Sequence, residues 1–268
     1  MELSIVIGAY QFIGFHLCKF LLEQGHEVLG ADWTNDDDLN HTTQEKQLEI
    51  GRNANFSYIS LQELKKVSNP GKITLYISWY DFIKSDSGKT AELKNELDAL
   101  LSKMPVADRT IVLYPIEYNG EERKMSKTDN VQDKIIFLPT IYGPWQPETM
   151  VFERGIESNG ETLPIAALET EYKLDAIFIT DFLACFEDII NLSENIITIK
   201  STKPNQWKLC ARAVFNSELT DAEMAGHQEN DKASFVYQLK NTVEPELGIE
   251  LQKVHHKRMQ TIGKWKMR

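Results

Sequence analysis

Cysteine is scarce in this sequence, and a long apolar run and a basic leader are both missing. The 268 residues include three cysteines, which are far apart and form no CxxC pair: Cys18, Cys185 and Cys210. We therefore expect reduced, buried thiols rather than a disulfide scaffold. No apolar run reaches the roughly 18 residues that span a bilayer, and the start, Met-Glu-Leu-Ser, lacks the basic segment of a signal peptide. These absences predict a cytoplasmic globular protein with no membrane partner.

Positive charge is also in short supply. The chain has 29 Lys and Arg against 40 Asp and Glu, a formal net charge of −11. Because nucleic-acid backbones and anionic membrane surfaces bind basic proteins, we expect neither as a partner. What the sequence does contain is 42% hydrophobic residues, enough for a substantial core in one large domain or in a domain with a smaller lobe.

Strand and helix patterns alternate from the start of the chain. Residues 3–9 are a β-branched apolar run that stops at glycine, residues 12–24 carry apolar side chains at helical spacing, and residues 26–32 indicate a second strand. A strand, a glycine turn, a helix and a strand within about 30 residues predict one βαβ unit with parallel strands.

The alternation continues to the end of the chain. Strands are expected at 56–59, 73–80, 109–114, 134–139 and 176–180, and helices at 91–103, from Asp181, near 234–243 and at 251–264. This layout predicts an α/β protein, a Rossmann-like doubly wound parallel sheet with a small C-terminal α+β lobe. We expect the Rossmann-like domain in residues 1–147, with 176–200 returning to it, and the lobe in residues 148–175 and 201–268.

The glycine turn, Gly8-Ala-Tyr-Gln-Phe-Ile-Gly14, lies where the first strand meets the first helix. In a dinucleotide-binding turn the first glycine makes the turn, the second admits the pyrophosphate, and the third packs helix on strand. Here the outer glycines are present and Gln11 occupies the middle position. The expected cofactor-binding residues are Gly8, Gln11, Phe12, Ile13, Gly14 and Asp32. The alternative is a fold that binds no dinucleotide, in which the glycines serve only the turn and the packing.

Asp32 ends the second strand, where a carboxylate can accept both ribose hydroxyls of NAD. The acidic run Asn35-Asp36-Asp37-Asp38 follows, and the next cation is Lys46. A 2′-phosphate beside that run would be repelled, so any dinucleotide that binds is expected to be NAD rather than NADP. The alternative is that Asp32 caps a turn and the acidic run is solvated surface.

Four segments together resemble one protein family. Val6–Asp32 is similar to the family's opening βαβ unit, and residues 109–120 are similar to its fifth strand and the loop that follows. The segment Leu138-Pro-Thr-Ile-Tyr-Gly-Pro144 is similar to an Arg-Pro-x-x-Val-Tyr-Gly-Pro signature. Residues 177–181 are similar to a strand that ends in Asp. The family is the extended short-chain dehydrogenases/reductases, the NAD-dependent epimerases and dehydratases of nucleotide sugars. The resemblance implies an NAD-binding fold and a homodimer formed through the helices after strands four and five.

The catalytic groups that the resemblance implies are not at their places. The family uses a Ser or Thr after strand five, where this chain has Tyr114 or Pro115, and a Tyr-x-x-x-Lys pair on the next helix. Residues 119–133 contain no Tyr and few apolar anchors, so we expect that helix to be shortened or absent, which would weaken the homodimer. One Tyr-x-x-x-Lys, Tyr80 to Lys84, follows strand four instead.

Three functions remain open. The favoured hypothesis is a degenerate member, a pseudoenzyme without standard oxidoreductase activity, that binds a nucleotide-type ligand or a protein partner, because three parts of the site are replaced together. The alternative is an active NAD-dependent epimerase, dehydratase or reductase with a rearranged site. Its acid/base would be Tyr118 or Tyr142 and its cation Lys84, Lys124 or Lys127. A different reaction on a nucleotide-like substrate in the same cleft is a third candidate.

The last eighteen residues, Leu251–Arg268, carry six Lys or Arg and no acid. An apolar helical face of Leu251, Val254, Ile262 and Trp265 predicts a helix docked on the lobe. The alternative is a basic contact for an anionic partner. His255 and His256 lack a third ligand at suitable spacing, so no metal site is expected.

Overall fold

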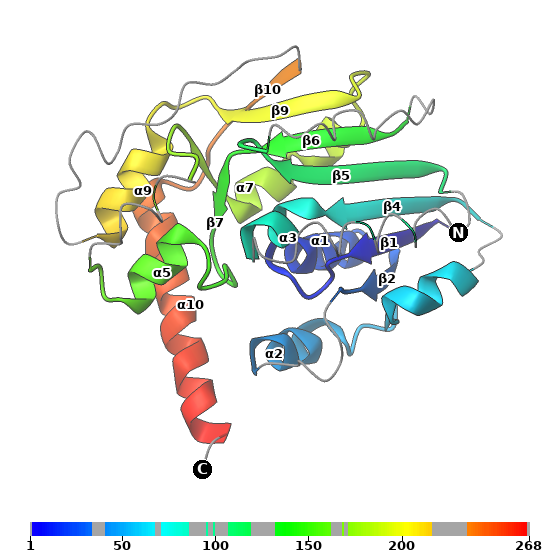
Figure 1. Cartoon of the computed structure of the whole chain (residues 1–268), viewed down its shortest axis with the longest axis horizontal. Helices are drawn as coiled ribbons and strands as arrows, with labels where there is room; N and C mark the ends of the chain where they lie inside the picture. Colours follow the sequence, from blue (N-terminus) through cyan, green and yellow to red (C-terminus); the bar gives the residue numbers. More distant parts are fainter. Residues whose placement is uncertain are drawn as a thin grey trace. The chain divides into compact units, whose positions relative to one another are not determined.

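A computed structural model describes residues 2–33, 41–67, 71–85, 107–118, 132–161, 171–215 and 235–266, together with positions 95, 99 and 168. The chain forms two compact units (Figure 1). Unit 1 comprises the described residues within 1–113 and 125–135, and unit 2 those within 114–124 and 136–268. The domain boundaries expected from the sequence remain a prediction.

Unit 1 is built on parallel strands, β1 (Leu3–Ile7), β2 (Glu27–Ala31), β3 (Phe56–Tyr58), β4 (Ile73–Ser78) and most of β5 (Arg109–Pro115). Ile5 of β1 lies in register with Leu29 of β2 on one side and with Leu75 of β4 on the other. The central strands β1 and β4 are buried along their whole length and rich in Ile, Val and Leu, as expected for a parallel sheet covered on its faces.

The helices of unit 1 are α1 (Phe12–Glu23), α2 (His41–Ile50), the 3-10 helix η2 (Leu61–Lys66) and α3 (Trp79–Ser85). α1 packs on β1, β2 and β4 through buried apolar residues that include Phe15, Leu17 and Leu21. It ends at Gln24, and Gly25 follows with a φ of +81°, the left-handed conformation that a glycine adopts without strain. The sequence pattern predicted this βαβ unit correctly.

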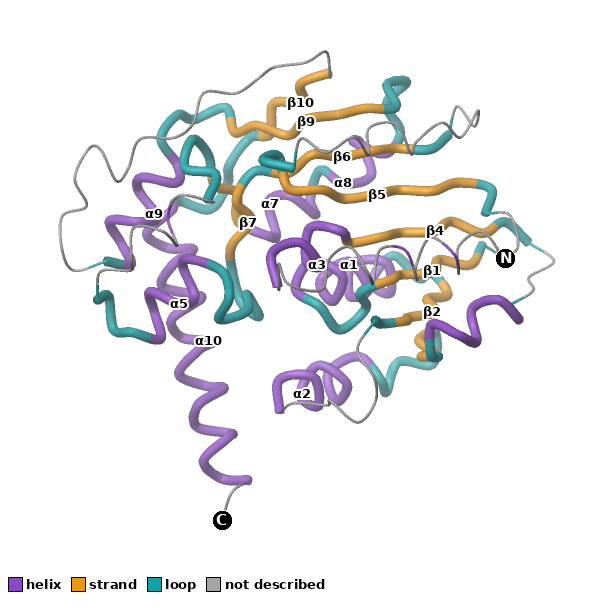
Figure 2. The backbone as a smooth tube through the Cα atoms, viewed as in Figure 1, coloured by secondary structure: helices purple, strands orange, loops and turns teal. Residues whose placement is uncertain are grey.

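Unit 2 holds most of β6 (Lys134–Leu138) and all of β7 (Thr140–Tyr142), β8 (Ala176–Phe178), β9 (Ile196–Ser201) and β10 (Phe235–Leu239). Its helices are α5 (Val151–Glu157), α7 (Ile179–Ala184), α8 (Phe186–Ile190), α9 (Gln206–Val214) and α10 (Pro245–Lys266), the long helix in Figure 2. Strands β7 and β8 pair with each other, and an apolar core that includes Phe152, Trp207 and Ile249 joins α5, α9 and α10.

The strand order in the eight-stranded sheet is β10-β9-β6-β5-β4-β1-β2-β3, and β5 and β6 each contribute residues to both units. The run β3-β2-β1-β4-β5-β6 is the order of a doubly wound dinucleotide-binding fold. The Rossmann-like α/β fold expected from the sequence is thus confirmed. Strand order reverses between β1 and β4, so this fold places its ligand crevice beyond the carboxyl ends of those two strands.

One predicted helix is wrong. Residues 234–243 were expected to be helical, but Phe235–Leu239 form β10, which pairs in parallel with β9 from Phe235↔Ile197 to Leu239↔Ser201. The segment Phe-Val-Tyr-Gln-Leu is rich in aromatic and β-branched residues, and strand pairing outweighs the helical spacing of its apolar positions. Two smaller corrections concern strand ends, because β4 stops at Ser78 and β8 at Phe178, with helices starting at the next residue.

The docking face of the C-terminal helix also differs from the expected one. α10 begins at Pro245, a residue suited to the first turn of a helix, rather than at Leu251. Leu251 and Val254 are exposed, whereas Ile249 and Gln252 are buried against the lobe. The apolar periodicity therefore indicated the wrong face, because a polar side chain, Gln252, occupies a buried position.

Several expectations fall outside the described residues. They concern the acidic run at 35–38, Lys124, Lys127 and most of the segment 119–133, and of the helix expected at 91–103 only positions 95 and 99 are described, both helical. Among the described residues, no helix combines the length and apolarity needed to cross a membrane, and no cluster of three or more His, Cys, Asp and Glu residues could hold a metal ion.

Candidate functional site

The glycine turn of unit 1 lies at the carboxyl end of β1, beside the carboxyl end of β4. Gly8 has a φ of +92°, and a Cβ at Gly14 would lie 1.9 Å from the carbonyl oxygen of Gly8. Both positions therefore require glycine, the first for the turn and the second for the approach of α1 to that turn. The roles expected for the two outer glycines agree with this geometry.

The carboxylate of Asp32 is turned into the glycine turn. One oxygen accepts the backbone N–H of Tyr10 at 2.7 Å, and the other accepts the side-chain amide of Gln11 at 2.9 Å. Asp32 is 4% exposed. Both oxygens that were expected to receive ribose hydroxyls are thus engaged by the protein itself.

Asp81, the third residue of α3, occupies the N-terminus of α1. Its carboxylate accepts the backbone N–H groups of Ile13 and Gly14, each at 3.0 Å, and the hydroxyl of Ser78 at 2.8 Å. The side chain is 2% exposed. A helix N-terminus with free N–H groups attracts phosphate, and here a carboxylate of the same chain takes that place.

Lys46 of α2 completes the buried network. Its ammonium donates to the carbonyl oxygen of Tyr10 at 2.8 Å and to that of Gln11 at 3.2 Å. The ammonium therefore holds the middle of the glycine turn from one side, while Asp32 and Asp81 hold it from others. We define the buried network as Gln11, Asp32, Lys46, Ser78 and Asp81.

Burial controls the ionisation of this network. It raises the pKa of Asp32 to about 6, against the hydrogen bonds from Gln11 and Tyr10, which lower it. It raises the pKa of Asp81 above its ordinary value and lowers the pKa of Lys46 to about 8. Each charged form is disfavoured by loss of water and is partly compensated by the opposite charge nearby.

Aromatic rings fill the space beside the turn. A Cβ on Gly8 would lie 2.9 Å from the indole of Trp33, so this ring rests directly on the turn. Trp33 packs edge-on against Phe82, and Phe82 packs edge-on against Trp79. Trp79 is buried, and the contact of Trp33 with the turn was not expected from the sequence.

The acid/base candidates lie in different surroundings. Tyr142 is buried in the apolar core of unit 2 against Phe152 and Phe178, and burial raises the pKa of its phenol. Tyr118 is half-buried and stacks on Tyr114 with ring centroids 5.5 Å apart, and burial raises its pKa as well. Neither pKa shift favours proton transfer near neutral pH.

The Tyr80 and Lys84 pair lies on α3, one turn apart as the spacing predicts. Tyr80 is 1% exposed, so its phenol belongs to the core of unit 1. The described residues therefore bring together the expected cofactor-binding residues of the turn, whereas the phenol of Tyr80 lies in the core.

Sequence reasoning missed three members of the buried network. Ser78 and Asp81 had a local signal, because Ser78-x-x-Asp81 joins the end of a buried strand to the first turn of the next helix, beside the fold's crevice. Lys46 had none, since it lies on a helix with a weak apolar pattern and its contacts span 35 and 36 residues.

Comparisons with known proteins give a consistent picture of the fold. No model of a known protein family matches the chain. The uncharacterized protein YjaV of Bacillus subtilis (strain 168) is 25% identical over 150 residues, which are 56% of this chain and 67% of that protein.

Solved structures match almost the whole chain. A UDP-glucuronic acid 4-epimerase from Bacillus cereus, in complex with UDP-glucuronic acid and NAD, aligns with a TM-score of 0.62 and 16% identity over 97% of this chain and 100% of that one. A UDP-glucose 4-epimerase from Thermotoga maritima, with UDP-glucose, has a TM-score of 0.58 and 15% identity over 97% and 100% of the two chains.

A dTDP-glucose 4,6-dehydratase from Bacillus anthracis, in complex with NAD, gives a TM-score of 0.57 and 12% identity over 96% of this chain and 97% of that one. At sequence identities this low, the alignments indicate a shared fold and not a shared activity. The chain has the Rossmann-like fold seen in NAD-dependent epimerases and dehydratases of nucleotide sugars.

Proposed function

We propose that this chain is a degenerate epimerase/dehydratase-like protein that acts by binding a nucleotide-type ligand or a protein partner, without oxidoreductase activity. One observation carries the proposal, the carboxylate of Asp81 on the N–H groups of Ile13 and Gly14. The residues around the turn do not fit an ordinary NAD pose, because a pyrophosphate and this carboxylate compete for the same N-terminus of α1.

Electrostatics adds to that competition. A pyrophosphate brought to the turn would meet the carboxylates of Asp81 and Asp32, two acids against the single ammonium of Lys46. In a buried place such like charges repel strongly, because little water screens them. Gln11 stands where the missing glycine would admit the phosphate, and its amide is already bonded to Asp32.

An active NAD-dependent enzyme is the second candidate. It is supported by the likeness to NAD-bound epimerases over 97% of the chain. In that case the buried network has to open before NAD binds, with Asp32 released to the ribose. We further propose that any bound dinucleotide is NAD rather than NADP, that a homodimer forms only weakly through the helices after β4 and β5, and that the protein is cytoplasmic.

Calorimetric titration of the purified protein with NAD, NADH, NADP and UDP-glucose tests the proposal. We expect no saturable binding of the dinucleotides to the wild type. The double substitution Gln11→Gly/Asp81→Ala frees the N–H groups and the space above them, so it is expected to bind NAD measurably. Glu63→Ala, which removes an exposed carboxylate that caps the N-terminus of η2, is the matched control and is expected to leave NAD binding unchanged.

Micromolar binding of NAD to the wild type would overturn the argument that Asp81 excludes a pyrophosphate, and it would favour the active enzyme. Circular dichroism of the double variant shows whether it folds. If it does not fold, Asp81→Asn gives the test, because it removes the negative charge from the N-terminus of α1 and keeps an acceptor oxygen for the N–H groups of Ile13 and Gly14.

A further inference from the structure

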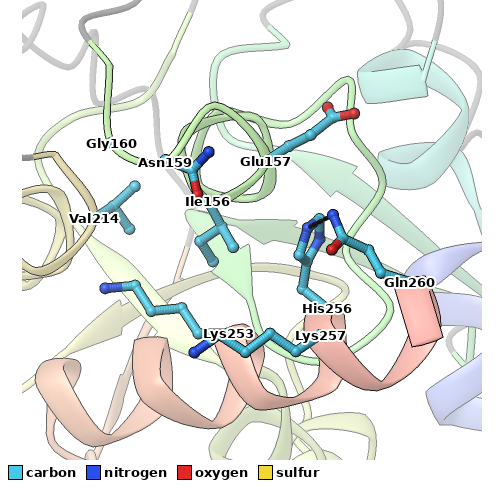
Figure 3. Close-up of a pocket in the computed structure, with 9 residues that line it drawn as sticks. All are labelled: Ile156, Glu157, Asn159, Gly160, Val214, Lys253, His256, Lys257 and Gln260. Carbon is cyan, nitrogen blue, oxygen red and sulfur yellow. Dashed lines mark hydrogen bonds between the residues drawn. The ribbon is translucent and has the colours of Figure 1, made fainter.

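A pocket of about 380 Å³ lies in unit 2 where three helices meet, α5, α9 and α10. Its volume is in the range of small-molecule sites. Figure 3 shows the side chains that line it, among them Ile156 of α5, Val214 of α9, and Lys253, His256, Lys257 and Gln260 of α10. This pocket contains no residue of the glycine turn, so an inference about it does not depend on whether NAD binds.

Two lysines line the pocket, in a chain of net charge −11. Lys253 and Lys257 are one helical turn apart on α10 and therefore share one face. In the part of the chain that the structure describes, neither ammonium forms an ion pair with a carboxylate. Glu157 also lines the pocket, but in Figure 3 its carboxylate points away from both lysines.

The polar groups are held in place by the protein. Lys253 donates one proton to the carbonyl oxygen of Ala213 at 2.7 Å, which anchors its ammonium and leaves two protons for a ligand. His256 lies between Glu153, with Nδ1 2.7 Å from Oε1, and the amide nitrogen of Gln260, 2.8 Å from its Nε2. These contacts orient Lys253, His256 and Gln260 before any ligand arrives.

Apolar side chains form another part of the lining. Ile156 and Val214 belong to the buried core between α5, α9 and α10. A ligand that fits must satisfy both the cationic and the apolar parts, so it carries a negatively charged group on an apolar body. Because two ammonium groups a turn apart match the oxygens of a carboxylate or a phosphate, these are the groups that the pocket selects.

We propose that the pocket between α5, α9 and α10 binds a small organic anion, with its carboxylate or phosphate group at Lys253 and Lys257 and its apolar part on Ile156 and Val214. This assigns a function to the basic C-terminal segment. Of the two alternatives for this segment, the proposal favours a contact with an anionic partner over a helix that is only structural. It also specifies that the partner is a small molecule.

Calorimetric titration with phenyl phosphate, inorganic phosphate, phenylacetate and benzyl alcohol tests the proposal. We expect saturable binding of phenyl phosphate or phenylacetate, weaker binding of inorganic phosphate, and none of benzyl alcohol. The two organic anions distinguish a phosphate site from a carboxylate site. Lys257→Met keeps the apolar stem, removes the charge, and is expected to weaken binding about tenfold, which corresponds to about 1.4 kcal/mol.

Lys264→Met is the matched control, because Lys264 is exposed on the same helix and does not line the pocket. It is expected to bind like the wild type. Absence of saturable binding of both organic anions to the folded wild type would overturn the proposal. So would equal weakening by Lys257→Met and Lys264→Met, which indicates a diffuse effect of charge, or equal affinity for phenyl phosphate and benzyl alcohol.

Discussion

The carboxylate oxygen Oδ2 of Asp81 lies 3.0 Å from the backbone nitrogen of Gly14, although the two residues are 67 positions apart in the sequence. Parallel strands end at the same edge of the sheet, so the turn after β1 and the first turn of α3 after β4 become neighbours. The bond places a negative charge at the positive end of the α1 dipole, which stabilises the helix start. It also takes the place that a phosphate group would need.

The first prediction concerns the stability of this helix start. Asp81→Ala leaves the N–H groups of Ile13 and Gly14 buried without their acceptor, and we expect the free energy of unfolding to fall by about 2–3 kcal/mol. Asp81→Asn keeps one acceptor oxygen and is expected to cost less. Urea unfolding followed by circular dichroism measures both. Equal costs for Ala and Asn would show that the hydrogen bonds contribute little.

The second prediction is a pH dependence from Asp32, whose pKa is about 6 in the folded protein against an ordinary value of 3.8. Between these values the folded state binds a proton that the unfolded state releases. Lowering the pH from 7 to about 4 therefore stabilises the fold through this group, by up to about 3 kcal/mol. Below pH 3.8, Asp32 is protonated in both the folded and the unfolded state, so the stabilisation increases no further.

Unfolding of the wild type and of Asp32→Asn at pH 7 and pH 5 isolates this effect, because the other titrating groups are common to both proteins. We expect the stability difference between them to change with pH in favour of the wild type at pH 5. A difference that is the same at both pH values would contradict the raised pKa. The comparison stops at pH 7 because Lys46, with a lowered pKa of about 8, titrates above it.

The third prediction separates backbone strain from a side-chain contact. Gly8 and Gly25 both have positive φ, +92° and +81°, but only Gly8 has the indole of Trp33 against it, whereas nothing lies within 4 Å of a Cβ on Gly25. Gly25→Ala is expected to cost about 1 kcal/mol, the strain alone. Gly8→Ala adds the clash and is expected to cost at least about 1 kcal/mol more.

A double-mutant cycle checks the origin of that excess. Trp33→Leu shortens the side chain above Gly8, so Gly8→Ala should cost less in the Trp33→Leu background than in the wild type. Thermal unfolding of the four proteins gives the coupling energy. No coupling would mean that Trp33 moves away freely.

The fourth prediction concerns the polar network around Gln252, the eighth residue of α10. Gln252 is 1% exposed, accepts the N–H of Gly143 at 3.0 Å, and donates to Gln146 at 2.8 Å and to Glu153 at 2.7 Å. Gln252→Leu leaves three buried polar groups without this partner, and we expect a loss of about 2–4 kcal/mol. Gln260→Leu, at an exposed position of the same helix, should cost less than about 1 kcal/mol, and urea unfolding of the two variants compares them directly.

Much of the fold was predictable from local pattern. The run Leu3–Ile7, the helix Phe12–Glu23 and the strand Glu27–Ala31 were correct to within two residues, because apolar periodicity and glycine positions express local sterics and burial. Strand β10 was not, because Phe235–Leu239 suits both a helix and a strand and only pairing with β9 decides between them.

In the folded chain, only a residue without a side chain fits the positions of Gly8 and Gly14. The sequence by itself determined the spacing of these two glycines, which predicted the turn between β1 and α1. It also showed that Gln11 replaces the glycine of the phosphate position. Only the tertiary structure decided which other side chains occupy the place beside the turn where a phosphate would bind. Asp81 and Lys46 reach the turn from 67 and about 35 residues away, and contacts over such separations depend on the order of strands in the sheet, which no local pattern encodes.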